Sequence, residues 1–256
     1  MSYFELLAKI VTDVRIAVSL STILPVGSAK PIDNGEVARA SWALPVAGLV
    51  VGLVGAAVYA IAHRVGLPAG VAAVLALAAT MLVTGALHED GFADTLDGLG
   101  GGKSREQKLE IMRDSRIGTY GACALIISIA LRWSALATIA GPAAVAVALL
   151  VAHAAARAAL PVFMWLVPPA RPDGLSAGAG QPPAQSAIIA ASLGVLCLAV
   201  GFGPGKTIMA LILLSIGALI WGFMAKRQIG GQTGDILGAL EQAGEIVVLL
   251  VATALV

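Results

Sequence analysis

The sequence predicts an all-α fold, a polytopic bundle of about seven transmembrane helices preceded by an amphipathic helix at the N-terminus. Hydrophobic residues make up 59% of the 256 residues, and charged residues only 12%. A soluble domain usually has about 25% charged residues. Apolar runs of about 20 residues recur, and each can cross a hydrocarbon core of about 30 Å as a helix. We expect residues 1–256 to form a single integral membrane domain.

The N-terminal segment differs from the apolar runs that follow it. Residues 3–24 mix apolar positions with Lys9, Asp13 and Arg15, a pattern that does not fit a cleavable signal peptide. An amphipathic helix on the membrane or against the bundle fits better. The expected spans follow in chain order at 42–62, 67–87, 117–140, 143–167, 186–202, 207–224 and 236–256.

The distribution of lysine and arginine predicts the orientation of these spans. With the N-terminus in the cytoplasm, twelve basic residues fall on the cytoplasmic side, and only Arg64 and Lys206 on the outer side. The twelve are Lys9, Arg15, Lys30, Arg39, Lys103, Arg105, Lys108, Arg113, Arg116, Arg171, Lys226 and Arg227. The formal net charge of +1 gives no argument for nucleic-acid binding.

Three polar stretches, 88–116, 171–181 and 230–245, then lie on the same cytoplasmic side. A transporter would place its polar groups near the midplane of the membrane, so this arrangement favours an enzyme with a one-sided active site.

An acidic motif follows the second expected span. Asp90, Asp94 and Asp97 are spaced four and three residues apart, which places them on one face of a helix. Three carboxylates on one stripe repel one another, and near a bilayer they need a compensating cation. Their hard oxygen ligands suit Mg²⁺, which commonly binds one or two carboxylates together with substrate phosphates. A solvated acidic loop paired with its own basic residues is the alternative.

A basic segment comes next. Three glycines precede Lys103, and Ser104 with Gln107 forms a capping-box pattern that predicts a helix running to about Arg116. A glycine-rich turn before a helix can bind phosphate through backbone N–H groups, and the arginines Arg113 and Arg116 can hold further phosphate oxygens. Asp114 is either a fourth metal ligand or the partner of a neighbouring arginine.

Other polar positions lie farther along the chain. Arg157 falls within the fourth span, where a charge is a candidate for function or for an interhelical ion pair. Arg171 lies in a turn rich in proline and glycine, and Asp235 follows a glycine-rich turn at the head of the last span. Glu241 and Glu245 share a helix face, and either line the site or lie at the membrane interface.

Three segments of the sequence resemble the cobalamin synthase family, the adenosylcobinamide-GDP ribazoletransferases. They are HEDGFADTLDG at 88–98, LEIMRDSRIGT at 109–119 and GQTGDILGA at 231–239, and the turn at 24–26 is similar as well. The resemblance covers nearly the whole chain. It implies a Mg²⁺-dependent, multi-pass enzyme of the bacterial inner membrane whose active site faces the cytoplasm.

The resemblance also implies a reaction. The cobinamide phosphate of adenosylcobinamide-GDP passes to α-ribazole or to its 5′-phosphate, and GMP leaves. On this basis we expect Asp90, Asp94, Asp97 and Asp114 to hold Mg²⁺, and Asp94, Asp97 and His88 to act in catalysis. We expect Lys103, Arg113, Arg116, Arg157, Arg171 and Asp235 to bind substrate. Membrane lipid is an expected partner, and a homo-oligomer is left open.

Two other functions compete with this one. The first is a phospholipid enzyme of the CDP-alcohol phosphotransferase type, whose acidic motif is similar in kind but contains an arginine. Here Asp90-Gly91 is followed by Asp94 with no arginine between them. The second is a small transporter of corrinoid precursors, which the one-sided polar loops disfavour.

Overall fold

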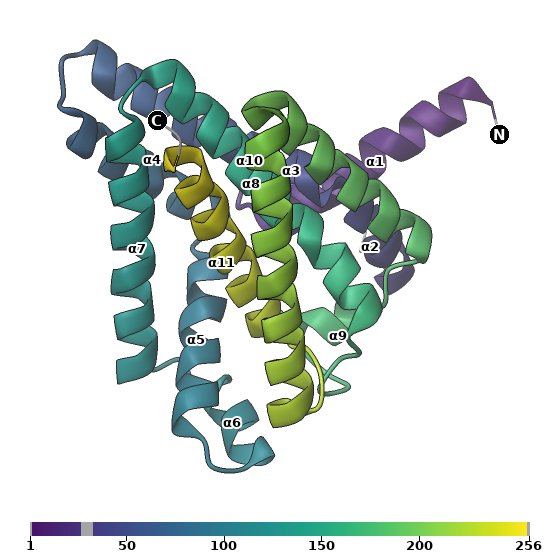
Figure 1. Ribbon diagram of the computed structural model, residues 1–256. Coiled ribbons are helices and arrows are strands. Elements are labelled where there is room, and N and C mark those ends of the chain that lie inside the picture. The colour runs from purple at the N-terminus through teal and green to yellow at the C-terminus, as the bar shows by residue number, and fades with distance from the viewer. Residues whose placement is uncertain (1, 27–32, 255–256) are drawn as a thin grey trace.

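The computed structural model describes residues 2–26 and 33–254, and this part of the chain is an all-α bundle without β-strands (Figure 1). The predicted fold class is therefore confirmed, while Lys30 lies outside the described residues. The helices are α1 Tyr3–Ser21, α2 Asn34–Ala40, η1 Ser41–Ala43, α3 Leu44–Arg64, α4 Ala69–Thr84, α5 Leu87–Gly101, α6 Arg105–Ile111, α7 Thr119–Ile139, α8 Pro142–Leu166, α9 Leu175–Ala179, α10 Ala184–Ile229 and α11 Gly234–Thr253.

Five helices of the described chain are long and apolar enough to cross a membrane. They begin with the continuous segment Gly35–Arg64 and continue with α7, α8, α10 and α11. The count rises to six if α4 and α5 form one broken span. The chain is thus a multi-pass membrane protein, and the difference from the seven predicted spans arises mainly in α10.

Helix α10 contains the predicted fifth and sixth spans and breaks between them. Its 46 residues would measure about 69 Å as a straight helix, more than twice the hydrocarbon thickness of a bilayer. Gly203 interrupts it with φ 73° and ψ 177°, a conformation that favours glycine, and Pro204 follows. The two arms of α10 meet at a sharp bend at the top of the bundle (Figure 1).

A second bend sets the direction of the acidic helix α5. The axes of α4 and α5 differ by 88°. Gly85 and Ala86, which join the two helices, both have left-handed backbone conformations, with φ of 63° and 56°. The segment after α1 is fixed at the same place, because the Ile23 N–H donates to the carbonyl of Val83 over 2.8 Å. Helix α5 therefore leaves the end of α4 at nearly a right angle.

Helix α1 is attached to the bundle by its second half. Its first half extends away from the other helices in Figure 1 and carries exposed apolar side chains, among them Phe4 and Leu7. Asp13 is buried, although the sequence placed it on the polar face of an amphipathic helix. Its carboxylate accepts hydrogen bonds from Arg39 at 3.0 Å and from the Trp42 indole at 3.0 Å. Asp13 thus holds α1 against α2 and η1.

We predict that Asp13→Ala loosens α1, because the change removes both bonds and leaves Arg39 and the Trp42 N–H without their partner. The expected cost is about 1–3 kcal/mol, and Tm in detergent should fall by several degrees. Lys9→Ala, an exposed position on the same helix, is the matched control and should leave Tm unchanged. Equal Tm values for the two variants would contradict this role of Asp13.

Candidate functional site

The predicted acidic face on α5 is present. Helix α5 continues through Gly91 and Gly98 without a break, so Asp90, Asp94 and Asp97 keep their helical spacing. Among the described residues, Asp90 and Asp94 have neither a hydrogen bond nor an ion pair through their side chains. Asp90 is exposed and Asp94 is half-buried. Two neighbouring acidic side chains on this helix thus have no basic partner among the described residues.

A close contact between α5 and α11 adds Asp235 to this face. A Cβ atom built on Gly91 would lie 3.1 Å from the Cα atom of Asp235 and 3.4 Å from that of Gly238. Glycines at positions 91 and 238 therefore let the two helix backbones approach closely. Partial burial disfavours a negative charge on Asp94, and so do the neighbouring carboxylates of Asp90, Asp235, Asp97 and Asp114. We call Asp90, Asp94 and Asp235 the acidic cluster.

Asp97 occupies a different environment from the other two aspartates of the motif. Its side chain is buried, and its two oxygens accept hydrogen bonds from the Gly118 N–H at 2.6 Å and the Gly121 N–H at 2.9 Å. Both N–H groups belong to the first turn of α7, whose N-terminus favours a negative charge. The metal and catalytic roles predicted for Asp97 must therefore compete with its role as a cap of α7.

The basic segment after α5 is shorter and more closely bonded than the sequence predicted. Ser104 caps α6 as expected, but α6 ends at Ile111 rather than near Arg116. Two of the three glycines lie within α5, and the Gly102 N–H donates to the carbonyl of Gly98, so the glycine run does not form an open phosphate loop. Lys103 is exposed just before α6.

Asp114 is engaged with a neighbour rather than with the acidic cluster. Its carboxylate forms an ion pair with Arg116 at 2.6 Å. The hydrogen bonds from Arg116 hold the pKa of the Asp114 carboxyl at about 2, below its usual range. Of the two roles considered for Asp114, the structure shows the pairing with arginine.

Two of the predicted arginines, Arg113 and Arg171, meet through an aspartate that the sequence analysis missed. Asp173 bonds to Arg113 at 2.6 Å and lies 3.6 Å from Arg171. Arg171 also approaches Asp235, with 3.9 Å between Nη2 and Oδ2, and its buried Nη1 atom has no hydrogen-bond partner among the described residues. Arg171 is thus a positive group beside the acidic cluster with donor capacity to spare.

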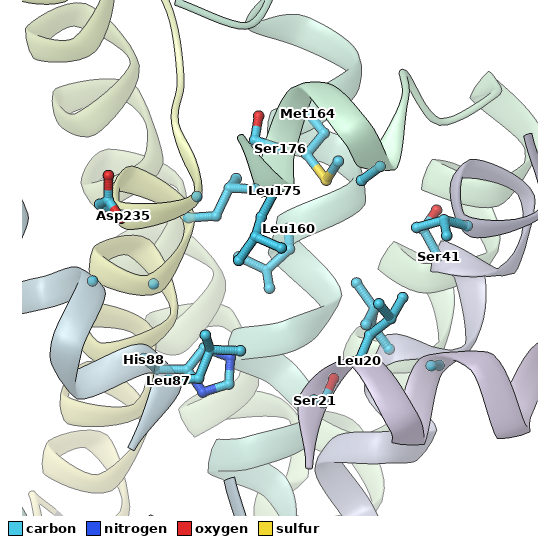
Figure 2. A pocket seen from close by; sticks show the side chains of 18 of the residues that line it. Leu20, Ser21, Ser41, Leu87, His88, Leu160, Met164, Leu175, Ser176 and Asp235 are labelled. Carbon is cyan, nitrogen blue, oxygen red and sulfur yellow. The ribbon is translucent and has the colours of Figure 1, made fainter. Parts of the chain in front are cut away.

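A cavity of about 240 Å³ borders the acidic cluster. His88 and Asp235 lie on one side of it, and Leu20 and Ser41 on the opposite side (Figure 2). Asp90 is part of the same wall as His88. The cavity therefore has a polar end shared with the acidic cluster and an apolar end between α1, α2 and α8.

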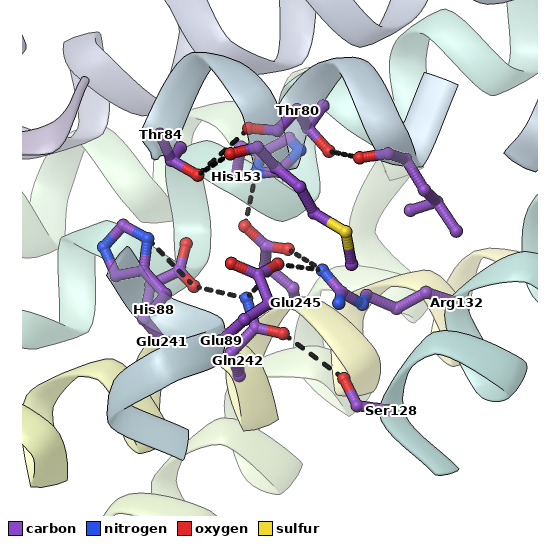
Figure 3. A network of polar contacts seen from close by, with 12 residues as sticks. Thr80, Thr84, His88, Glu89, Ser128, Arg132, His153, Glu241, Gln242 and Glu245 are labelled. Carbon is purple, nitrogen blue, oxygen red and sulfur yellow. Dashed lines mark hydrogen bonds and ion pairs between the residues drawn. The ribbon is translucent and has the colours of Figure 1, made fainter. Parts of the chain in front are cut away.

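A network of buried charged groups lies behind this wall, where α5, α7, α8 and α11 meet (Figure 3). Arg132 bonds to Glu89 at 3.1 Å and to Glu245 at 3.3 Å. Gln242 donates to Glu89 and accepts a hydrogen bond from Ser128. The network comprises His88, Glu89, Arg132, His153, Arg157, Glu241, Gln242 and Glu245, and all eight residues are buried.

Arg157 belongs to this network and not to the cavity. It is 1% exposed and forms ion pairs with Glu241 and Glu245. Other side chains of the bundle surround the guanidinium, so the substrate-binding role predicted for Arg157 stays a prediction that this position does not favour. Glu241 and Glu245 line neither the cavity nor the membrane interface. Their spacing of four residues was the signal in the sequence, but it did not identify their partners.

His153, Glu241 and Glu245 offer ligand atoms within 4.8 Å of one another, a spacing that also suits a metal ion. The Arg157 guanidinium bonds to His153 and forms ion pairs with both glutamates. A cation already occupies this position, so the group is better described as part of the ion-pair network.

His88 connects the network with the cavity. Its Nδ1 atom lies 3.3 Å from Nη2 of Arg157. A guanidinium can only donate hydrogen bonds, so Nδ1 accepts, and the neutral imidazole carries its proton on Nε2. Among the described residues Nε2 has no protein partner. His88 therefore presents an N–H group that is free to donate to a bound molecule.

The fold and the site define a multi-pass helical membrane protein with an acidic site beside a partly apolar cavity. The chain matches the description cobalamin-5-phosphate synthase over residues 13–253, and it belongs to that family. No solved structure matches it.

Three relatives illustrate the similarity, and each is named adenosylcobinamide-GDP ribazoletransferase. The protein from Bradyrhizobium diazoefficiens is 65% identical over 98% of this chain and 96% of its own length. That from Mesorhizobium japonicum is 52% identical over 96% of this chain and 94% of its own length. That from Azorhizobium caulinodans is 44% identical over 95% of this chain and 96% of its own length.

We predict that alanine substitution of Asp97 lowers Tm, whereas alanine substitution of Asp94 does not. Asp97→Ala leaves two N–H groups of α7 without an acceptor, which should cost about 1–2 kcal/mol and lower Tm in detergent by several degrees. Asp94→Ala removes a charge that its neighbours repel, so Tm should stay constant or rise. A thermal melt of both variants without substrate tests this, and a wild-type Tm for Asp97→Ala would exclude the capping role.

Proposed function

We propose that this chain is an adenosylcobinamide-GDP ribazoletransferase that acts in the last steps of cobalamin biosynthesis. A ribose hydroxyl of α-ribazole, or of its 5′-phosphate, attacks the phosphorus that carries cobinamide. The bond from this phosphorus to the bridging oxygen of the diphosphate breaks, GMP leaves with that oxygen, and the hydroxyl proton is released. The names of the relatives support this reaction over phospholipid synthesis or corrinoid transport.

The acidic cluster is the observation that carries this proposal. Asp90 and Asp94 have no basic partner among the described residues, and Asp235 adds a third carboxylate across a close helix contact. Such a set of oxygen donors fits a divalent cation, because mutual repulsion is relieved when the ion binds. We infer that Asp90, Asp94 and Asp235 hold Mg²⁺. The ion supplies Lewis-acid stabilisation of charge on the diphosphate.

The arginines around the cluster complete the binding of a diphosphate. Arg171 lies next to Asp235 and retains a buried N–H donor without a partner. Arg113 shares Asp173 with it and is exposed, so both guanidiniums can turn to phosphate oxygens, for which their fork of donors is suited. Lys103 and Arg116 are exposed nearby and can attract the anionic substrates.

His88 orients a substrate group through its Nε2–H. The predicted role of His88 as the acceptor of the hydroxyl proton requires a lone pair on Nε2, which the contact with Arg157 disfavours in the neutral ring. An oxygen of the acceptor ribose or of the transferred phosphate is the group that such a donor suits. A carboxylate of the acidic motif is the alternative acceptor of the proton.

The location follows from the orientation rule. Basic residues on the loops beside the acidic cluster favour a cytoplasmic site, and the family resemblance favours the inner membrane of bacteria.

We predict that Asp94→Ala abolishes turnover while the fold stays intact. Loss of a ligand for the cation should lower kcat by at least about 10³-fold, equivalent to several kcal/mol of transition-state stabilisation. The assay measures GMP release from adenosylcobinamide-GDP and α-ribazole with Mg²⁺, and with EDTA as the metal-free comparison. Glu110→Ala, an exposed carboxylate on α6, is the matched control. Full activity in EDTA would remove the metal from the mechanism.

We predict that His88→Gln retains more activity than His88→Ala. The glutamine amide places an N–H near the position of Nε2, so kcat should stay within about tenfold of wild type, whereas loss of the donor should cost about 10²-fold or more. A base cannot be replaced by an amide. Equal losses in the two variants, with a flattened acidic limb of the pH–rate profile in both, would instead identify His88 as the proton acceptor.

A further inference from the structure

We propose that the cavity beside the acidic cluster is the subsite for the aromatic base of the acceptor nucleoside, with the ribose at its polar end. This inference rests on the proposed function and identifies which part of which substrate the cavity binds.

The apolar end of the cavity sets the first condition on its occupant. Apolar side chains from several helices form most of its lining, including Leu20 of α1, Leu44 of α3, Leu160 and Met164 of α8, and Leu237 of α11. The serine hydroxyls there are largely engaged within the protein, since Ser41 donates to a carbonyl of α2 and Ser176 donates to Gln232. This end therefore offers few hydrogen bonds to a ligand and suits an apolar ring.

The size of the cavity sets the second condition. Pockets that enclose drug-sized molecules have volumes of about 300–1,000 Å³, so a cavity of about 240 Å³ cannot enclose a corrin macrocycle with its side chains. The guanine of the donor is small enough. However, its edge of donors and acceptors would lose its bonds to water without replacement among the leucines, at a cost of several kcal/mol.

The acceptor satisfies both conditions. The base of α-ribazole is 5,6-dimethylbenzimidazole, a fused bicyclic ring with two methyl groups and no N–H once it is attached to ribose. Such a ring can be buried among aliphatic side chains with little loss of hydrogen bonding. Its sugar provides the polar groups that the apolar end cannot hold.

The polar end of the cavity gives this ligand a direction. His88, Asp90 and Asp235 all line the cavity, and Figure 2 shows His88 and Asp235 on the side opposite Leu20. Asp90 and Asp235 also belong to the acidic cluster. A base buried at the apolar end would thus place the ribose at the carboxylates, where its hydroxyl must meet the diphosphate. Holding the two reactants in this order lowers the entropic cost of the transfer.

The first test uses the free base with the wild-type enzyme. 5,6-Dimethylbenzimidazole should inhibit GMP release competitively against α-ribazole and not against adenosylcobinamide-GDP. Benzimidazole, which lacks the two methyl groups, should inhibit about tenfold more weakly, as expected for two buried methyl groups. Competition with the donor, or equal inhibition by the two bases, would overturn the proposal.

The second test fills the cavity. Ala179 is half-buried on α9 and lines the cavity, and it is not part of the acidic cluster. Ala179→Leu should raise KM for α-ribazole at least tenfold, while KM for the donor and kcat at saturation stay within twofold. Gly178→Leu is the matched control, because a Cβ atom there meets open space.

The two proposals fail in different ways. If the wild-type enzyme releases no GMP from adenosylcobinamide-GDP and α-ribazole, the proposed function is wrong. If turnover occurs but Ala179→Leu leaves both KM values unchanged, or raises only that of the donor, the base subsite is wrong. The unchanged result is also what a cavity filled by a lipid chain would give.

Discussion

The buried ion-pair network between α5, α7, α8 and α11 is the constraint on which the site depends. Three glutamates, two arginines and two histidines lie in the interior of a membrane bundle, where each unpaired charge is costly. Every charged group must therefore keep its partner, which fixes the register of four helices relative to one another. Arg132 and Arg157 contribute most to this restraint. Arg132 pairs with both Glu89 and Glu245, and Arg157 pairs with both Glu241 and Glu245.

This register determines how α5 presents its successive side chains. Glu89 points into the network, and His88 joins the network to the cavity through Arg157. Asp90 and Asp94 then face the start of α11, where the contact at Gly91 and Gly238 brings Asp235 beside them. A bend of 88° after α4 lets a single short helix serve both the core and the site.

Much of this arrangement could be predicted from the sequence, since the apolar runs gave the helices and the spacing of the aspartates gave one acidic face. The partners could not be predicted. Asp97 looks equivalent to Asp94 in the sequence, but the first turn of α7 takes up both of its oxygens. Glu89 and Asp90 are adjacent acids with opposite environments. Local periodicity describes the faces of a helix, whereas only tertiary packing decides what each face meets.

The acidic residues of α5 and α11 form two sets, which differ in whether arginines of the chain neutralise their charge. The glutamates Glu89, Glu241 and Glu245 are buried and compensated by arginine from within the chain. Asp90, Asp94 and Asp235 repel one another, and among the described residues only Arg171, 3.9 Å from Asp235, offers a positive charge beside them. The same helices thus carry one set of charges that the fold has neutralised and one that it has not. A divalent cation that also binds a diphosphate would supply the positive charge that the second set lacks, which is the role we propose for these aspartates.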